Sequence, residues 1–408
     1  MVSFFRVGSC IFCFLLFCLS MLYAQPLDVT LQAKEAILIN AESGKVLFEK
    51  DAHKPAFPAS ITKIATALFV LDKYHNRLDE MFSVSKEALR SLNSEEKRRR
   101  EYASPAYWLE EGSRSLGLLV GEKETLRSLL GAMLIASGND ASNVVAEGIG
   151  GTIPHFMEGM QEYLKEIGCE KSCFKNPHGL HHPLHVTTAF EMAEMTRRAM
   201  KIDEFQKIVS SLFYTHGTHS FSQTNRLMKK GKYFYPYAIG VKTGHTSRAE
   251  YNLVAAAEKE GRRLIAVLMG CGESVQCYED AQNLFEAAFR EKKRQKTLLQ
   301  APKTFQMKIE GAKTLLQTSL AEDVTVTFYP SEEEPLSLFL HWKTPLLLPI
   351  AKGAHVATIE LFSAKKEKVM QIPLFAKEDV SPTFFHQWKE FFSSFFGDKK
   401  KDEKMQKR

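Results

Sequence analysis

The run from Phe57 to Leu71 places a proline, a serine and a lysine at the start of an amphipathic segment. Pro58 stands where helices commonly begin. The apolar residues that follow recur at helical spacing; they are Ile61, Ile64, Ala65, Leu68 and Leu71. The pattern therefore predicts a buried helix. Residues three apart share one face of a helix, so the Lys63 amine is expected beside the Ser60 hydroxyl.

A serine followed three residues later by a lysine can supply a nucleophile and its base. The hydroxyl becomes an effective nucleophile when a neighbouring base removes its proton, and a helix N-terminus favours the negative charge that develops. The spacing by itself is not specific, because a surface serine near a solvated lysine gives the same pattern. It also occurs at Ser83/Lys86, Ser94/Lys97, Ser172/Lys175 and Ser363/Lys366.

The length and composition are those of a globular protein. The chain has 408 residues, of which 44% are hydrophobic and 25% are charged. This length accommodates one large domain and a smaller one. The formal net charge of +6 is small for the length and gives no indication of nucleic-acid binding.

The first 24 residues have the layout of a secretory signal peptide. One basic residue, Arg6, precedes an apolar run from Cys10 to Leu19, and Ala24 provides a small residue before Gln25. The alternative is an uncleaved N-terminal membrane anchor. In both cases the remainder of the chain is expected to be exported.

Four cysteines lie beyond this segment, at Cys169, Cys173, Cys271 and Cys277. Export permits one or two disulfide bonds among them, and the three possible pairings remain open. Neither cysteine pair has the spacing of a zinc site, and no metal is predicted.

Hairpins and helices alternate along the middle of the chain. The segments 36–39 and 46–48 predict one β-hairpin, and 251–257 and 264–269 predict a second, so the sheet should be antiparallel. Helices are expected over 124–135, 156–166, 187–200 and 278–290. The mixed-charge segment 93–113 is interpreted as a solvated insertion, with binding of an anionic partner as the alternative.

The sequence beyond residue 290 changes character twice. Short alternating runs predict a small all-β domain, and a run of aromatic residues from Phe384 to Phe396 follows at helical spacing. A short polar helix with this aromatic face and a basic end suits the membrane interface; the alternative is a helix packed on its own domain. The predicted organisation is a signal peptide (1–24), a large domain (25–290), a linker (291–301), a small all-β domain (302–380) and an amphipathic helix with a basic tail (381–408).

Two further motifs complete a set with the Ser60 pair. Ser137-Gly-Asn139 and Lys242-Thr-Gly244 follow it in order, and such a set occurs in penicillin-binding proteins and class A β-lactamases. Ser60 is the expected nucleophile and Lys63 its base. Ser137 can relay the proton to the leaving amine, and Asn139 can orient Lys63 and the substrate amide. Lys242 and Thr243, on an edge strand, can bind a carboxylate, and Gly244 leaves room for the substrate backbone.

The sequence from about residue 35 to 289 resembles the serine D-alanyl-D-alanine carboxypeptidases, the low-molecular-mass penicillin-binding proteins of peptidase family S11. The motifs that carry the resemblance are Pro58–Lys63, Met133–Ala141, Asn176–Leu180 with His185, Gly240–Thr246 and Tyr251–Ala257. The small all-β domain, with its run Pro345–Gly353, and the tail resemble the C-terminal parts of the same family.

The resemblance implies an α+β fold in which a helical subdomain adjoins a five-stranded antiparallel sheet, as in DD-peptidases and β-lactamases. It implies that Ser60 attacks the penultimate D-alanine of peptidoglycan stem peptides, releases the terminal D-alanine and forms an acyl-enzyme that water hydrolyses. The backbone N–H groups of Ser60 and His245 would form the oxyanion hole, and β-lactams would acylate Ser60. No cofactor is implied. The expected location is the periplasmic face of the cytoplasmic membrane, held at its anionic surface through residues 383–408.

The chain departs from the family pattern at two positions. Cys277 stands where the family usually has an arginine, a candidate contact for the substrate carboxylate, and Arg248 could compensate. Glu250 stands where the family usually has a glycine. Endopeptidase or transpeptidase activity on the same peptides stays open, as does a penicillin-binding scaffold without turnover. A β-lactamase and a zinc site among the histidines of 178–185 are the less favoured alternatives.

Overall fold

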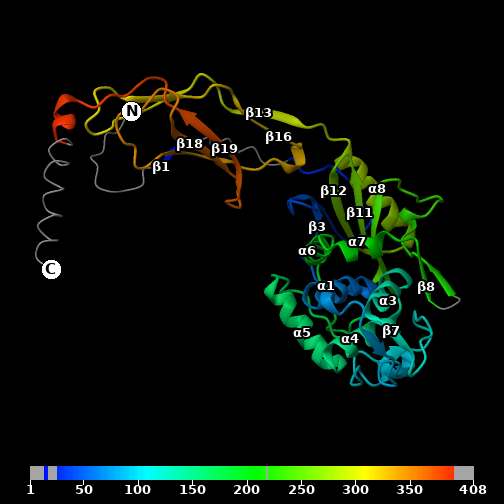
Figure 1. Ribbon diagram of the computed structural model, residues 1–408. Coiled ribbons are helices and arrows are strands. Elements are labelled where there is room, and N and C mark those ends of the chain that lie inside the picture. The colour runs from blue at the N-terminus through cyan, green and yellow to red at the C-terminus, as the bar shows by residue number, and fades with distance from the viewer. Residues whose placement is uncertain (1–12, 17–24, 217–218, 390–408) are drawn as a thin grey trace, which may run out of the picture. The chain divides into compact units, whose positions relative to one another are not determined.

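The computed structural model describes residues 13–16, 25–216 and 219–389 (Figure 1). The predicted signal peptide lies outside these residues except for the short strand β1 (Cys13–Leu16), and the predicted tail is described only to residue 389. The chain divides into a larger unit, Pro26–Glu291, and a smaller unit that contains Lys292–Arg408 and the N-terminal residues.

A five-stranded antiparallel sheet in the order β10-β11-β12-β2-β3 forms the centre of the larger unit. The strands are β2 (Glu35–Asn40), β3 (Val46–Lys50), β10 (Ala238–Thr246), β11 (Glu250–Lys259) and β12 (Arg262–Cys271). Both predicted hairpins are confirmed as β2–β3 and β11–β12. The order places β10, with its Lys-Thr-Gly motif, at the edge of the sheet.

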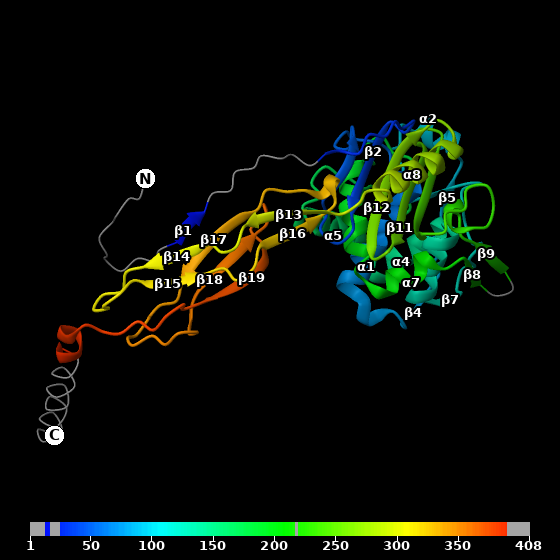
Figure 2. The same ribbon diagram turned by 90° about the horizontal axis from the view of Figure 1, so that it is seen from above.

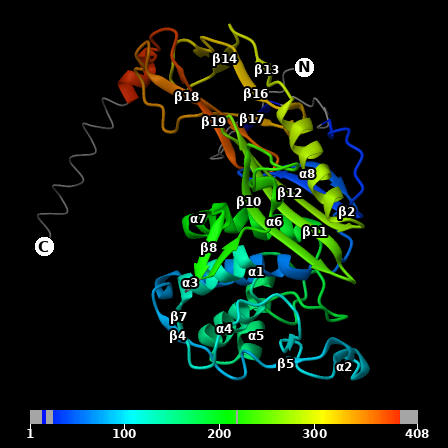
Figure 3. The same ribbon diagram turned by 90° about the vertical axis from the view of Figure 1, so that its right-hand side faces the viewer.

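Alternate residues of these strands face two separate cores, because side chains of a strand point to opposite faces. One face, with Leu253 and Leu268, packs against α8 (Ser274–Phe289). The other, with Val254 and Val267, packs against α1 (Thr62–Tyr74) and α6 (Ala189–Ala199). Figure 3 shows α8 on one face of the sheet and α1 and α6 on the other. The sheet is therefore covered on both sides, which agrees with its near-continuous apolar strands.

Helix α1 is the centre of the helical part of this unit. Every residue from Thr62 to Leu71 is buried, so the predicted buried helix is confirmed. The helices around it are α3 (Leu126–Gly131), η3 (a π-helix, Ala132–Ala136), α4 (Asn139–Gly150), α5 (Ile153–Glu166) and α7 (Asp203–Ser210). Short elements complete the unit: η1 (Ala59–Ile61), η2 (His75–Arg77), η4 (Arg226–Met228), β4 (Met81–Ser83), β7 (Lys123–Thr125), β8 (Phe213–His216) and β9 (His219–Ser222).

The segment 93–113 contains regular structure and a buried lysine. It forms α2 (Ser94–Arg99), and its strand β6 (Leu109–Glu110) pairs in parallel with β5 (Ser91–Leu92). Lys97 is buried, and its Nζ lies 3.1 Å from a carboxylate oxygen of Glu110. Most of the segment is exposed or half-exposed, as expected of a solvated insertion, and the exceptions are Lys97 and Leu109. The ion pair with Glu110 compensates the burial of the lysine.

The smaller unit is all-β, as the sequence predicts. Its main sheet has the order β1-β17-β18-β19, and two further pairs are β13–β16 and β14–β15 (Figure 2). The strands are β13 (Arg294–Leu299), β14 (Thr304–Met307), β15 (Leu316–Ser319), β16 (Val324–Phe328), β17 (Ser337–Trp342), β18 (His355–Phe362) and β19 (Lys368–Phe375), with η5 at Pro330–Glu332. The segment 291–301, predicted as a linker, contains β13. The basic residues of this segment indicated a linker. The structure instead has strand β13 there, which pairs with β16 farther along the chain.

The aromatic tail begins within the described residues. Residues 384–389 are helical, and Phe384, Phe385 and Trp388 are exposed. The rest of the predicted amphipathic helix lies outside the described residues. Among those that are described, no helix combines the length and apolar character needed to cross a bilayer.

Candidate active site

Ser60 lies in a tight turn that leads into α1. The turn is the 3-10 helix η1, and Ala59 adopts a positive φ of 50°. The amide of Asn252, on β11, donates hydrogen bonds to the carbonyls of Phe57 (2.8 Å) and Pro58 (2.9 Å). Thr62 Oγ1 donates to the carbonyl of Ala59 at 2.8 Å. These bonds hold a backbone conformation that L-residues seldom adopt, and they fix the position of the half-buried Ser60 side chain.

Two glycines pack directly against this turn. A Cβ atom at Gly179 would lie 1.9 Å from the Ala59 carbonyl oxygen, and Gly179 has a φ of +92°. A Cβ atom at Gly244, on the edge strand β10, would lie 2.8 Å from the Pro58 carbonyl oxygen and 3.0 Å from the Ser60 nitrogen. The close approach of both backbones explains why these positions carry glycine.

We expect Gly179→Ala to displace the Ser60 turn and to destabilise the fold by about 3 kcal/mol, because the new Cβ meets backbone and the φ is unfavourable. Thermal unfolding and the rate of acylation by a fluorescent penicillin measure the two effects. Gly168→Ala is the matched control, since Gly168 has a φ of +84° and open space around it. Equal acylation losses in the two variants would contradict the role assigned to the close contact.

The structure places the Lys63 amine beside Ser60, as the spacing predicts. Lys63 Nζ lies 3.1 Å from Ser60 Oγ, and it also donates to Asn139 Oδ1 and to the carbonyl oxygen of His178, both at 2.7 Å. Lys63 is fully buried. Burial, followed by the nearby Lys242 charge, lowers the pKa of Lys63 well below its usual range, while Asp140 opposes the shift. A lysine with a depressed pKa is a competent general base near neutral pH.

Ser137 lies at the end of the π-helix η3, in a left-handed conformation with φ 65°. Such π-turns inside helical segments are frequent at functional sites. Lys242 Nζ donates to Ser137 Oγ at 3.0 Å and to the Thr243 carbonyl at 2.9 Å. Burial and the charge of Arg114 lower the pKa of Lys242 to about 7. Ser137 therefore connects the helical part of the unit to the edge strand.

Asn139 begins α4, and the next residue anchors the chain around it. The Asp140 carboxylate accepts the backbone N–H groups of Leu116 (2.9 Å) and Gly117 (3.0 Å) and the hydroxyl of Ser115 (2.5 Å). The buried Asn139 side chain is thus held where its oxygen meets Lys63.

The predicted substrate-binding residues lie along β10. Lys242 and Gly244 are buried, Thr243 is half-buried, and His245 is exposed with its ring stacked on Tyr251, at a centroid distance of 4.3 Å. Thr243 Oγ1 donates to Thr224 Oγ1 at 2.8 Å. Thr224 was not predicted as a site residue, since it has no motif of its own. Because β10 is the edge strand, its outward backbone groups can pair with an extended peptide.

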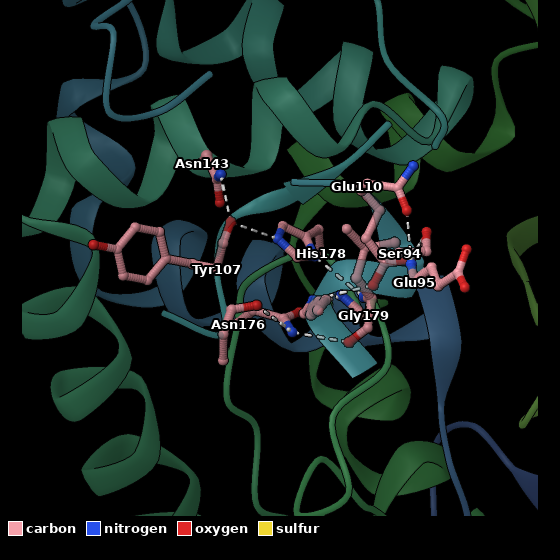
Figure 4. A network of polar contacts seen from close by, with 12 residues as sticks. Ser94, Glu95, Tyr107, Glu110, Asn143, Asn176, His178 and Gly179 are labelled. Atoms are coloured by element: carbon pink, nitrogen blue, oxygen red, sulfur yellow. Dashed lines mark hydrogen bonds and ion pairs between the residues drawn. The ribbon is translucent and has the colours of Figure 1, made fainter. Parts of the chain in front are cut away.

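The loop from Asn176 to Leu180 supports Lys63 from the other side. The Tyr107 carbonyl accepts from Asn143 (2.9 Å) and from His178 Nε2 (3.1 Å), while His178 Nδ1 accepts the Leu180 N–H at 3.1 Å (Figure 4). Burial, and next the Lys63 charge, lower the pKa of His178 well below its usual range. His178 is therefore neutral, and its carbonyl orients Lys63. The motif at 176–180 predicted this loop, but it did not predict the hydrogen bond between the His178 carbonyl and Lys63.

His185, another histidine of the 178–185 group, has hydrogen-bond partners of its own. His185 Nδ1 accepts the Lys175 N–H at 3.1 Å and its Nε2 lies 2.9 Å from Thr62 Oγ1. Burial lowers the pKa of His185 to about 3, so it is neutral as well. Within the part of the chain that the structure describes, no three acidic, histidine or cysteine residues are arranged to hold a metal ion.

Cys277 forms a disulfide bond with Cys271, which joins the end of β12 to the first turn of α8. Both cysteines are buried, whereas Cys169 and Cys173 are free thiols. The disulfide settles the pairing that the sequence left open, and it occupies the position of the usual arginine. Glu250, the second departure, adopts a φ of 55° and pairs with Lys34 at 2.8 Å.

The assembled site is that of a serine hydrolase that works by acyl transfer. A half-buried serine hydroxyl is paired with a lysine of low pKa, and a second serine is paired with a second lysine beside an open strand edge. All the catalytic and substrate-binding residues predicted from the sequence lie around this one location.

The chain belongs to the D-alanyl-D-alanine carboxypeptidase family, Peptidase S11, which it matches over residues 21–273. Residues 294–382 match the C-terminal domain of penicillin-binding protein 5. The chain is 29% identical to the D-alanyl-D-alanine carboxypeptidase DacF of Bacillus subtilis over 361 residues, which cover 87% of each protein. It is also 29% identical to DacC of Escherichia coli, over 90% of this chain and 91% of that protein.

A solved structure of penicillin-binding protein 5 from Haemophilus influenzae has the same fold. The TM-score is 0.60 at 23% identity, over 87% of this chain and 99% of that one. The chain is thus a serine-type enzyme of the D-alanyl-D-alanine carboxypeptidase family, and the expected family and fold are confirmed.

Proposed function

We propose that Ser60 of this chain cleaves the terminal D-alanine from peptidoglycan stem peptides that end in D-Ala-D-Ala. The observation that carries the proposal is the contact of 3.1 Å between Ser60 Oγ and the buried Lys63 amine, whose pKa is lowered by burial. A neutral amine at this distance can accept the hydroxyl proton as the oxygen attacks.

The reaction begins with attack of Ser60 Oγ on the carbonyl carbon of the penultimate D-alanine, while Lys63 takes the proton. The oxyanion of the tetrahedral intermediate accepts hydrogen bonds from the backbone N–H groups of Ser60 and His245. The close packing of Gly244 against the Ser60 nitrogen brings these two segments together and supports this assignment.

The Ser137 hydroxyl, 3.0 Å from Lys242 Nζ, then gives its proton to the leaving nitrogen. The proton that Lys63 took from Ser60 restores this hydroxyl, so Lys63 is neutral again. The C–N bond breaks, D-alanine leaves, and the penultimate D-alanine remains as an ester on Ser60. Water attacks this ester with Lys63 as base, which regenerates the free hydroxyl. No cofactor takes part in these steps.

The strand edge of β10 supplies the binding surface. An extended peptide can add to it by main-chain hydrogen bonds, while Lys242 and Thr243 contact the terminal carboxylate. The same geometry accommodates a β-lactam, whose strained amide would acylate Ser60. Endopeptidase and transpeptidase reactions use the same acyl-enzyme and differ in the leaving group or acceptor.

The test is to incubate the chain with an N-acylated peptide ending in D-Ala-D-Ala and to measure free D-alanine. Release above that of a Ser60→Ala chain supports the carboxypeptidase function. Penicillin labelling of Ser60 without any D-alanine release would instead support a scaffold that lacks turnover, and a cross-linked product with an added amine would show transpeptidation.

We also propose that the enzyme is exported and acts at the outer face of the cytoplasmic membrane, held there by residues 383–408. Two observations support this. Phe384, Phe385 and Trp388 are exposed, although large apolar side chains usually pack inside. On the opposite side of this segment, a Cβ atom at Gly311 would lie 2.2 Å from the His386 ring, so the segment contacts the all-β domain through His386. This arrangement leaves the aromatic side chains available to the interface.

Deletion of residues 383–408 is expected to abolish co-sedimentation of the chain with vesicles that contain anionic lipid, because both the aromatic face and the basic end are lost. D-Alanine release from a soluble peptide should be unchanged, which serves as the control for folding. Undiminished vesicle binding by the truncated chain would refute the anchoring role.

A further inference from the structure

Arg114 is fixed to the loop that carries Ser137 and Asn139. Its Nε donates to the carbonyl of Ala136 at 2.9 Å, and its own carbonyl accepts the N–H of Asn139 at 2.9 Å. The residues that follow it wrap around the Asp140 carboxylate through their backbone N–H groups. Arg114 is therefore held by Ala136 and Asn139, which lie on either side of Ser137 in the chain, although no sequence motif includes Arg114.

The guanidinium of Arg114 is exposed, and its two terminal nitrogens make no hydrogen bond or ion pair with any residue that the structure describes. Its charge nevertheless reaches the site, because it contributes with burial to the low pKa of Lys242. The Asp140 carboxylate is already engaged by Ser115 and by backbone N–H groups. Two neighbouring cations that repel each other favour an anion that contacts both.

Other arginines near the site act elsewhere. The charge of Arg248 acts on His181, whose ring contacts Phe57 at a centroid distance of 4.8 Å. The charge of Arg226 acts on Tyr278, at the first turn of α8. Cys277, at the position of the usual arginine, is in the disulfide and carries no charge. Of these arginines, Arg114 is the one whose charge lowers the pKa of Lys242.

We propose that Arg114 is a substrate-binding residue whose guanidinium pairs with the C-terminal carboxylate of the peptide, next to Lys242. The proposal rests on the function proposed above and identifies the cation that performs the task of the missing arginine. A guanidinium can bind a carboxylate through two parallel N–H donors, which adds orientation to charge.

The test compares two peptides that differ only in charge. One ends in D-Ala-D-Ala with a free carboxylate, and the other ends in D-Ala-D-alaninamide. The rate of release of D-alanine or D-alaninamide is measured for the full chain and for Arg114→Gln, Arg114→Lys and Arg248→Gln. The last is the matched control, since it removes an exposed arginine near the site that does not act on Lys242.

For Arg114→Gln we expect kcat/KM on the carboxylate peptide to fall roughly 10- to 100-fold, mainly through KM, because a charge-assisted pair is lost. The amide peptide should be little affected, so the preference for the carboxylate collapses. Arg114→Lys should retain part of the preference, and Arg248→Gln should retain all of it.

An equal loss on both peptides would show that Arg114 only supports the loop and would overturn the proposal, as would a collapse of the preference in Arg248→Gln alone. If the unmodified chain releases neither product, the carboxypeptidase function fails. The role of Arg114 is then decided by acylation of Ser60 with a penicillin and with its methyl ester. If Arg114→Gln slows acylation by the penicillin but not by its methyl ester, the role of Arg114 is supported. If the variant and the unmodified chain are acylated by the penicillin at equal rates, the role is refuted.

Discussion

Replacing Ser60 by alanine is expected to lower D-alanine release by roughly 10⁴-fold or more and to abolish covalent labelling by penicillin, because no other hydroxyl occupies the attacking position. Ser137 is the nearest alternative, but its hydroxyl accepts from Lys242 rather than from the low-pKa Lys63. Mass spectrometry of the intact chain after exposure to a penicillin measures the acylation directly.

The matched control for this substitution is Ser83→Ala. Ser83 also precedes a lysine by three residues, but it is exposed on β4. We expect this variant to label and to turn over as the unmodified chain does. Thermal unfolding of Ser60→Ala should be nearly unchanged, since the half-buried hydroxyl loses a single hydrogen bond. Continued penicillin labelling of Ser60→Ala at another residue would disprove the assignment of the nucleophile.

Replacing Lys63 by methionine is expected to slow acylation by roughly 10²- to 10⁴-fold, the usual contribution of a general base. The methionine keeps most of the apolar stem in the buried position. It leaves the oxygens of Asn139 and His178 without the donor they share, so thermal unfolding has to be measured beside the rate.

The pH profile distinguishes a base from a structural lysine. Lys63 has to be neutral to accept a proton, so the rate should fall as the pH drops through its lowered pKa. Lys242 has to be protonated to bind a carboxylate, so kcat/KM should fall as the pH rises through about 7. The two lysines interact, so the two limbs belong to the pair. The profile of kcat/KM is therefore expected to be bell-shaped.

Two variants assign the limbs. In Lys63→Met the acid limb should disappear from the residual activity. In Lys242→Gln the repulsion that depresses the pKa of Lys63 is lost, so the acid limb of penicillin acylation should move to higher pH. An acid limb that stays at the same pH in Lys63→Met would exclude Lys63 as the titrating base.

The parts of the fold that follow local periodicity could be predicted. The helix after Ser60 and the two hairpins depend on patterns in short stretches of the chain, and the structure agrees with each. The β13 strand was missed because its charged residues gave no alternation, and its pairing with β16 is a long-range contact. The buried Lys97 was missed for the same reason, since its partner Glu110 lies outside any local pattern.

By itself the sequence predicted which groups react. Three short motifs in this order were sufficient to indicate an acyl-transfer site, because they seldom occur together by chance. Their residues are Ser60, Lys63, Ser137, Asn139 and Lys242. The contact between Ser60 and Lys63 could also be predicted, because both lie on one turn of the chain.

Tertiary structure alone decided how these groups behave. Lys63 meets Asn139 and the His178 carbonyl across 76 and 115 residues of sequence, and Lys242 meets Ser137 across 105. The low pKa of both lysines follows from their burial and from the charges that the fold brings next to them. The physical reason is that burial and charge proximity are properties of packed surfaces, which local spacing along the chain does not encode.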